Sequence, residues 1–130
     1  MSERGKPNVI CPHPVLYFDK GTETRRWKFS IEPIQVEYGP LVCLVDDADM
    51  ILNFAAAKSA VSSRLRSLAF DPELDYFLAA GDMTMYGLMI AVSMLEYART
   101  PRQHRFSQRY QRYNILPSME VAPDGVTLHN

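Results

Sequence analysis

Two apolar segments, each followed by a helical pattern, dominate the order of hydrophobic and polar positions. They lie in residues 41–45 and 75–80, and continuous apolar runs of this length are typical of strands buried on both faces of a sheet. Apolar residues then recur at three- and four-residue spacing over 50–68, which predicts an amphipathic helix that ends at Asp71 and Pro72. The nearly all-apolar segment 83–98 predicts a second helix, central to the domain.

The N-terminal third of the chain has weaker patterns. Residues 1–14 are polar and rich in proline, which predicts an extended arm or an edge segment. Residues 15–18 predict a short strand and residues 22–26 a charged loop. Alternating apolar positions over 27–37 favour a strand interrupted by Pro33.

The C-terminal third predicts antiparallel structure. Residues 104–116 form a candidate hairpin with Phe106 and Tyr113 in opposite arms, and residues 126–128 form a last short strand. Two buried strands that are each followed by a helix imply parallel pairing with right-handed crossovers. We therefore expect one α/β domain over residues 1–130, with a small mixed sheet, a parallel βαβ core, two helices and flanking antiparallel hairpins.

Composition agrees with a single folded domain. The chain has 130 residues, of which 47% are hydrophobic and 22% charged, and this excludes disorder, collagen and coiled coil. No apolar leader stands in residues 1–10, and the longest apolar stretch, 83–95, is shorter than the roughly 20 residues that a spanning helix needs. We expect a soluble protein of the cytoplasm, without membrane contact.

Charge is unevenly distributed along the chain although the formal net charge is only -1. Nine acidic residues lie from Glu32 to Asp82, against three basic ones. Residues 97–119 hold five arginines and no acid. The chain therefore offers two candidate binding surfaces of opposite sign.

The basic surface interleaves guanidiniums with aromatic rings. Its candidate residues are Arg99, Arg102, Arg105, Arg109, Tyr110, Arg112 and Tyr113. Arginine pairs with phosphate or carboxylate, and aromatic rings stack on bases or fill pockets of a protein partner. The alternative is a hairpin kept soluble by its arginines, with Phe106 and Tyr113 covering the core.

The acidic surface is a candidate mimic of nucleic-acid charge. Its residues are Asp46, Asp47, Asp49, Asp71, Glu73 and Asp75. Carboxylates after neighbouring strands, here Asp46, Asp47 and Asp82, are also typical of a Mg²⁺-dependent phosphohydrolase. The competing interpretation makes Asp49 and Asp82 helix N-caps.

Other motifs carry less chemistry. Residues 44–47 resemble the acidic opening of response-regulator receiver domains, but the lysine that receivers need is missing after Lys58. Gly81 and Asp82 lie at a predicted strand-to-helix turn, where a phosphate could bind. The signal for such a site is weak, because a single glycine does not make a glycine-rich loop. Cys11 and His13 supply two ligands where structural zinc wants four, so both are expected to be inert. No metal or cofactor is expected.

Three short segments together carry a resemblance to a group of proteins. They are 11–19, 75–82 and 105–113, with the motifs Cys-Pro-His-Pro-Val, Asp-Tyr-Phe-Leu and Arg-Phe. The chain resembles small accessory proteins encoded by bacteriophages. This resemblance implies a protein that binds and disables a host machine, such as a polymerase or a nucleic-acid-targeting defence complex, in the host cytoplasm.

We therefore expect a non-enzymatic protein that binds and modulates or inhibits a host nucleic-acid-handling complex, as anti-CRISPR proteins do. Direct nucleic-acid binding by the arginine and aromatic hairpin is the second hypothesis, and the Mg²⁺-dependent phosphohydrolase is the third. The residues leave open which surface, acidic or basic, contacts the partner, and in which oligomeric state.

Overall fold

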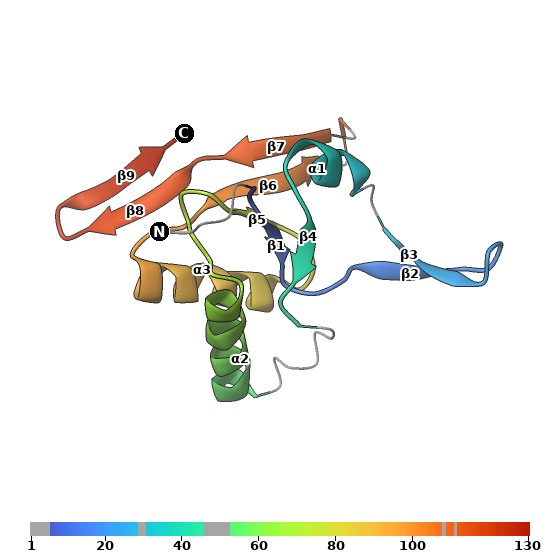
Figure 1. Ribbon diagram of the computed structural model, residues 1–130, viewed down its shortest axis with the longest axis horizontal. Helices are drawn as coiled ribbons and strands as arrows, with labels where there is room; N and C mark the ends of the chain where they lie inside the picture. Colours follow the sequence, from blue (N-terminus) through green and yellow to red (C-terminus); the bar gives the residue numbers. More distant parts are fainter. Residues whose placement is uncertain (1–5, 29–30, 46–52, 108, 111) are drawn as a thin grey trace.

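The computed structural model describes residues 6–28, 31–45, 53–107, 109–110 and 112–130. Its elements are shown in Figure 1. In chain order they are β1 (Val9–Cys11), β2 (Leu16–Asp19), β3 (Thr24–Trp27), α1 (Glu32–Glu37), β4 (Leu41–Cys43), α2 (Phe54–Ser67), β5 (Tyr76–Leu78), α3 (Met83–Tyr97), β6 (Arg102–Ser107), β7 (Arg112–Leu116), β8 (Ser118–Ala122) and β9 (Gly125–His129).

A five-stranded mixed sheet in the order β4-β1-β5-β6-β7 forms the centre. The first four strands are parallel, and β7 pairs antiparallel with β6. This confirms the α/β class, the mixed sheet and the parallel βαβ core.

Strand β1 corrects the expectation of an N-terminal arm over residues 1–14. Val9, Ile10 and Cys11 are fully buried between β4 and β5, because three apolar residues suffice for a strand that is paired on both sides. Strand β4, expected to be buried on both faces, is instead the half-buried edge of the sheet.

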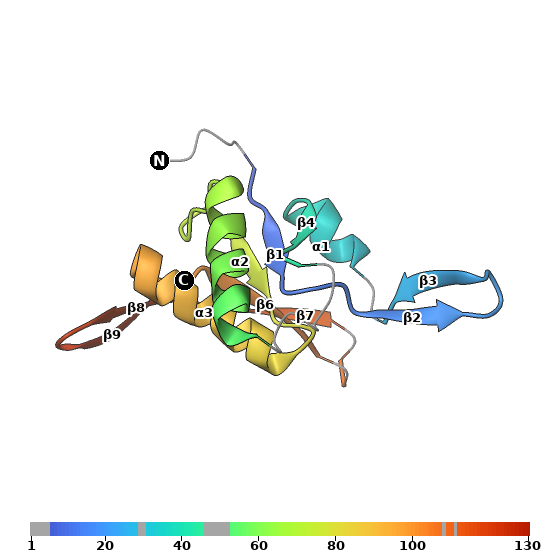
Figure 2. The same ribbon diagram turned by 90° about the horizontal axis from the view of Figure 1, so that it is seen from below.

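The direction of the chain reverses within this sheet. From β1 the chain passes to β4 on one side, and from there it returns past β1 to β5 and then to β6. Right-handed crossovers in opposite directions place their helices on opposite faces. Accordingly α2 and α3 cover one face and α1 the other, as Figures 1 and 2 show.

The face of the sheet that α2 and α3 cover is called here the closed face, and it carries an apolar core. The sheet contributes Ile10 and Phe77, while α2 and α3 contribute residues at helical spacing. These are Ala57, Val61, Leu65, Met85, Leu88, Met89 and Val92. Helix α3 is not central as expected, since Met83 and Leu95 on its outer side are exposed.

The starts of both helices are capped by side chains. The Oδ1 atom of Asp82 accepts a hydrogen bond from the amide of Met85, which makes Asp82 the N-cap of α3 as one of our alternatives proposed. The cap of α2 is Asn53, whose Oδ1 accepts from Ala56. Asp49, the other proposed cap, lies outside the described residues.

Helix α2 ends several residues before Pro72. Ala69 adopts a left-handed conformation with φ 52°, and the amide of Phe70 donates to the carbonyl of Leu65. This is the hydrogen bond of a Schellman motif. The motif lets Phe70 join the core cluster on the closed face.

The other face is called here the open face, and α1 is its only helical cover among the residues that the structure describes (Figure 2). Ile34 of α1 packs with Val9, Cys11, Tyr76 and Leu78. The interrupted strand expected over 27–37 is wrong, because Pro33 stands in the first turn of α1, where proline is tolerated.

Two antiparallel ribbons project from opposite ends of the domain (Figures 1 and 2). One pairs β2 with β3, so that β3 occupies most of the expected loop 22–26. The other pairs β8 with β9. Strand β9 includes the expected strand 126–128, whereas β8 was not predicted.

Candidate functional site

The β6–β7 hairpin confirms the predicted hairpin over residues 104–116. Its register pairs Phe106 with Tyr113, in opposite arms as expected. Because side chains alternate along a strand, His104, Phe106 and Tyr113 face α1 on the open face, and Arg105 with its partner Asn114 faces the other way. The hairpin therefore presents two chemically different surfaces.

The tip of the hairpin brings two arginines to one exposed ring. The guanidinium carbons of Arg109 and Arg112 lie 5.5 and 5.4 Å from the ring centroid of Tyr110. Both distances are within the range of a cation–π contact. Tyr110 is 59% exposed, and its backbone amide donates to the hydroxyl of Ser107 at 3.3 Å. The tip therefore holds an accessible ring flanked by two positive charges.

A hollow adjoins this tip. It has a volume of about 400 Å³ and is lined by Arg105, Phe106, Ser107, Arg109 and Asn114. Arg105 and Arg109 are both exposed. We call Arg105, Arg109, Tyr110 and Arg112 the hairpin tip. This set joins four of the seven residues predicted for the basic surface.

Arg99 and Arg102, also predicted there, contact other parts of the domain. Arg99 donates to Ser118 Oγ at 2.7 Å and to the Glu73 carboxylate at 3.1 Å. The guanidinium of Arg102 lies 4.4 Å from the centroid of the Tyr76 ring and donates to the carbonyl of Glu73 at 3.4 Å. Their charges are therefore engaged in contacts within the domain.

The predicted acidic surface does not form among the residues that the structure describes. Asp75 is completely buried, and its two carboxylate oxygens accept from the amides of Asn8 and Asp71 at 2.8 and 2.9 Å. Asp71 in turn accepts from the amide of Glu73. These acids fix the turn before β5. Asp46, Asp47 and Asp49 lie outside the described residues.

The crevice where the chain direction reverses is filled by a side chain. Ligands of open α/β sheets usually bind there, at the carboxyl ends of the strands. Here His13, after β1, accepts a hydrogen bond from the amide of Asp82 at 2.8 Å. A Cβ atom on Gly81 would lie 2.7 Å from His13 Nε2. The weak phosphate site considered at Gly81 and Asp82 is thus occupied by the chain itself.

Cys11 lies beside this crevice and is held as a thiol. Its contact with Cys43 and its burial raise the pKa of the Cys11 thiol, and its Sγ donates to the carbonyl of His13 at 3.1 Å. A thiol is a far weaker nucleophile and metal ligand than a thiolate. These contacts support the expectation that Cys11 is inert.

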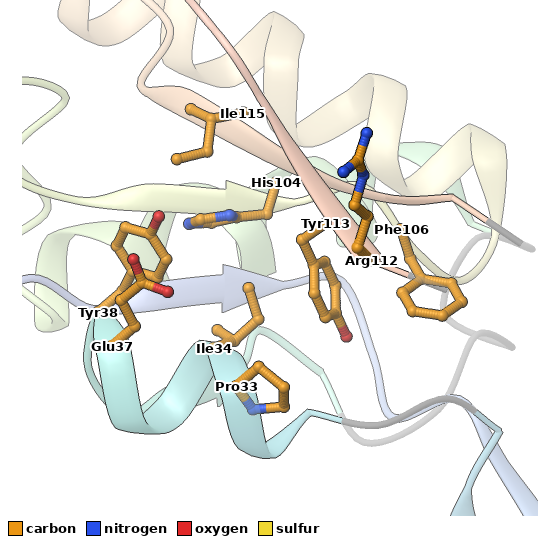
Figure 3. A pocket seen from close by; sticks show the side chains of 9 residues that line it. All are labelled: Pro33, Ile34, Glu37, Tyr38, His104, Phe106, Arg112, Tyr113 and Ile115. Carbon is orange, nitrogen blue, oxygen red and sulfur yellow. The ribbon is translucent and has the colours of Figure 1, made fainter. Parts of the chain in front are cut away.

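Tyr113, the last residue of the predicted basic surface, lies on the open face. It lines a cavity of about 300 Å³ between α1 and the hairpin. Figure 3 shows its ring on one side of His104 and the ring of Tyr38 on the other. Burial, and to a smaller extent a charge effect from Cys11, raise the pKa of Tyr113 to about 12, so this phenol is neutral at physiological pH.

Sequence reasoning missed the projecting β2–β3 ribbon as a second basic and aromatic surface. It pairs Tyr17 with Arg26 and Phe18 with Arg25, and all four residues are exposed. Gly21 between two short patterned segments was the available signal. The hollow beside it is lined by basic, aromatic and polar side chains, among them Arg25 and Trp27. An ion pair of 3.3 Å joins Arg26 to Asp19.

Comparison of the chain with protein-family models, with curated proteins and with solved structures gives no match. Within the described part of the chain, no helix has the length and apolar character needed to cross a membrane. No group of three or more histidine, cysteine or acidic side chains among the described residues is arranged to hold a metal ion.

Proposed function

We propose that the protein is a non-catalytic binding protein that contacts its partner through the hairpin tip. The main observation in support is that the exposed Tyr110 contacts the guanidiniums of Arg109 and Arg112 with its ring. Tyrosine and arginine are the residues most enriched among energetically dominant interface positions. A ring whose contacts with two side chains limit its motion loses less conformational entropy on binding.

The partner that fits this tip carries phosphate or clustered carboxylates. Guanidiniums form paired hydrogen bonds with both groups. Together with the resemblance to bacteriophage accessory proteins, this supports a host nucleic-acid-handling complex, of defence or of transcription, as the target. The proposed action is to modulate or inhibit that complex in the host cytoplasm.

The tip is favoured over the acidic surface as the contact. Asp75 is buried and Glu73 is paired with Arg99, so neither offers a free charge to a basic groove. Arg105 and Arg109 are exposed on the hairpin. The exposure of these arginines therefore supports the hairpin over the described acids as the contact.

The test is an affinity pull-down of the tagged protein from bacterial lysate, with and without nuclease. The variant Arg105→Ala/Arg109→Ala should lose the captured complex, because both substitutions truncate the tip. The control variant Arg64→Ala/Arg66→Ala removes the same charge from α2 and should retain it. Equal capture by both variants would refute the tip as the contact.

Direct nucleic-acid binding is the second candidate, because an exposed ring between two guanidiniums also suits base stacking. It predicts that affinity for a single-stranded oligonucleotide falls steeply with salt, since each neutralised phosphate releases counterions. Purified protein and a labelled oligonucleotide in an anisotropy titration decide this. Salt-independent or absent binding would reject direct recognition, whereas a protein that is captured after nuclease treatment favours the first proposal.

A further inference from the structure

His104 differs from most buried polar side chains of this protein, because both of its ring nitrogens lack a hydrogen-bond partner within the described residues, whereas His129 has one such nitrogen. Its side chain has no exposed surface, and neither Nδ1 nor Nε2 has a hydrogen-bond partner in the described part of the chain. Buried side-chain nitrogens and oxygens are nearly always paired, because leaving one unpaired costs about 1–3 kcal/mol. A fold that keeps such a histidine has two unmet hydrogen-bonding positions at one place.

The surroundings of His104 are aromatic. Its ring centroid lies 4.3 Å from that of Tyr38, 4.8 Å from that of Tyr76 and 6.3 Å from that of Tyr113. Burial, with a smaller effect from the Arg102 charge, lowers the pKa of His104 to about 4. The imidazole is therefore neutral at physiological pH and offers one donor and one acceptor.

The cavity that His104 lines combines flat apolar walls with two charged side chains. The rings of Phe106 and Tyr113 come from the hairpin. Glu37 from α1 and Arg112 from β7 border the cavity, and the Arg112 guanidinium points away from the rings of Phe106 and Tyr113 in Figure 3. The volume of about 300 Å³ lies at the lower end of the range for small-molecule sites, enough for one planar ring system with a small substituent.

We propose that the cavity between α1 and the β6–β7 hairpin binds a nucleobase, with the ring against the aromatic walls, the polar edge at His104, and the phosphate outside the cavity, where Arg112 turns from Tyr110 to meet it. A base supplies a flat face for stacking and both donors and acceptors on its edge. A guanidinium is suited to the attached phosphate. A purely apolar ligand would leave both nitrogens of His104 unpaired.

Access to the imidazole needs one ring to move. Tyr38 is the nearest of the three aromatic neighbours and stands at the C-terminal end of α1, a helix of six residues. Its side chain is only half-buried. Displacement of the Tyr38 ring by the incoming base would exchange one aromatic contact of His104 for another and add the missing hydrogen bonds.

This site does not rest on the proposed function. It lies on the open face of the hairpin, opposite Arg105; its central residue, His104, is not part of the hairpin tip, and Arg112 is the one residue that the two share. A loss of partner capture on truncating Arg105 and Arg109 and a loss of nucleotide binding on changing His104 are separate results. Either can occur without the other.

The test titrates the native protein, labelled with ¹⁵N in histidine, with AMP, GMP, CMP and UMP and with the matching nucleosides. Binding of at least one nucleotide should shift the His104 ring nitrogens, because hydrogen bonds form at both atoms. His104→Phe should weaken that binding by about tenfold or more, since tenfold corresponds to one typical net hydrogen bond of about 1.4 kcal/mol. His129→Phe, the same change on β9, is the matched control.

Arg112→Ala tests the phosphate end. It should weaken binding of the monophosphate several-fold and leave the nucleoside unaffected, while Arg64→Ala changes neither. A single-stranded oligonucleotide that binds at least tenfold more tightly than any mononucleotide identifies an unstacked base in a strand as the natural ligand. Equal affinities identify a free nucleotide.

Two results would overturn the proposal. One is that no nucleoside or nucleotide binds at millimolar concentration. The other is binding that leaves the His104 ring nitrogens unshifted. The second measurement uses the native chain, so it decides the question even where His104→Phe fails to fold.

Discussion

The two faces of the central sheet are built from the same strands but are covered very differently. The closed face lies under α2 and α3, helices of 14 and 15 residues whose side chains fill the space against Ile10 and Phe77. The open face lies under α1, a helix of six residues. A cavity and an unpaired histidine remain beside that short helix.

This difference separates stability from binding. A long amphipathic helix buries a continuous stripe and leaves no room for a ligand, so the closed face serves folding. A short helix covers only part of the sheet, and the hairpin must complete the cover from the other side. The residues at that junction, among them His104 and Tyr113, line the cavity that remains.

The largest expected effect comes from truncating a matched pair of leucines. Leu65 on the closed face and Leu78 on the open face are both fully buried. Leu65→Ala should reduce the free energy of unfolding by about 3–5 kcal/mol and Leu78→Ala by about 2–3 kcal/mol, because Leu78 shares its cluster with Ile34 of the short helix α1, which can move into the vacated space more easily than α2 or α3 can. Urea unfolding measures both. An equal or larger loss for Leu78→Ala would show that the open face is packed as tightly.

The pH dependence of stability should report on the open face. The pKa of His104 is lowered to about 4 in the folded protein, against about 6.5 in the unfolded chain. Between these values the unfolded chain binds the additional proton, so stability is complete above about pH 6.5 and falls as pH decreases towards about 4. The loss approaches about 3 kcal/mol, at 1.36 kcal/mol per pKa unit.

Comparison of the native protein with His104→Phe isolates this effect from the titration of carboxylates. Denaturant midpoints measured from pH 7.5 to pH 4 should diverge as pH falls, with the variant losing less stability. At neutral pH the variant should be at least as stable as the native protein, because an apolar ring replaces an unpaired polar one. Parallel pH profiles of the two proteins would contradict this account.

The smallest effect concerns how the helices begin. Asp82 and Asn53 cap α3 and α2 on the closed face, whereas Ile31 at the start of α1 makes no side-chain cap. Asp82→Ala and Asn53→Ala should each cost about 1 kcal/mol. Glu32→Ala, in the first turn of α1, should cost less than about 0.5 kcal/mol. Thermal unfolding midpoints rank the three variants. A larger loss for Glu32→Ala than for Asp82→Ala or Asn53→Ala would show that the start of α1 contributes more to stability than the capped starts of α2 and α3.

Local sequence patterns predicted the elements that depend on residues close together in the chain. The apolar run before Gly81 predicted β5, and Asp82 at the following turn predicted the N-cap of α3. The aromatic residues Phe106 and Tyr113 on either side of a polar bend gave the hairpin with its pairing. Each depends on contacts between residues close in sequence, or on periodicity, and both are visible in the chain itself.

Elements defined by distant contacts were missed or misplaced. Val9–Cys11 is short and flanked by prolines, and only pairing with β4 and β5 makes it an interior strand of the sheet. Asp75 belongs to an acidic stretch by composition, yet it is buried, and its carboxylate accepts hydrogen bonds from the amides of Asn8 and Asp71. The composition of a segment does not show where its partners stand.

The sequence by itself determined the α/β class, the hairpin with its arginines and the capped start of α3, because propensity, periodicity and short-range hydrogen bonds act within a few residues. Only the tertiary structure decided which arginines remain at the surface, that His13 fills the crevice at the carboxyl ends of the strands, and that His104 is buried unpaired beside a cavity. Those outcomes depend on which segments pack together, and the cost of burying a polar group arises only once its neighbours have replaced water.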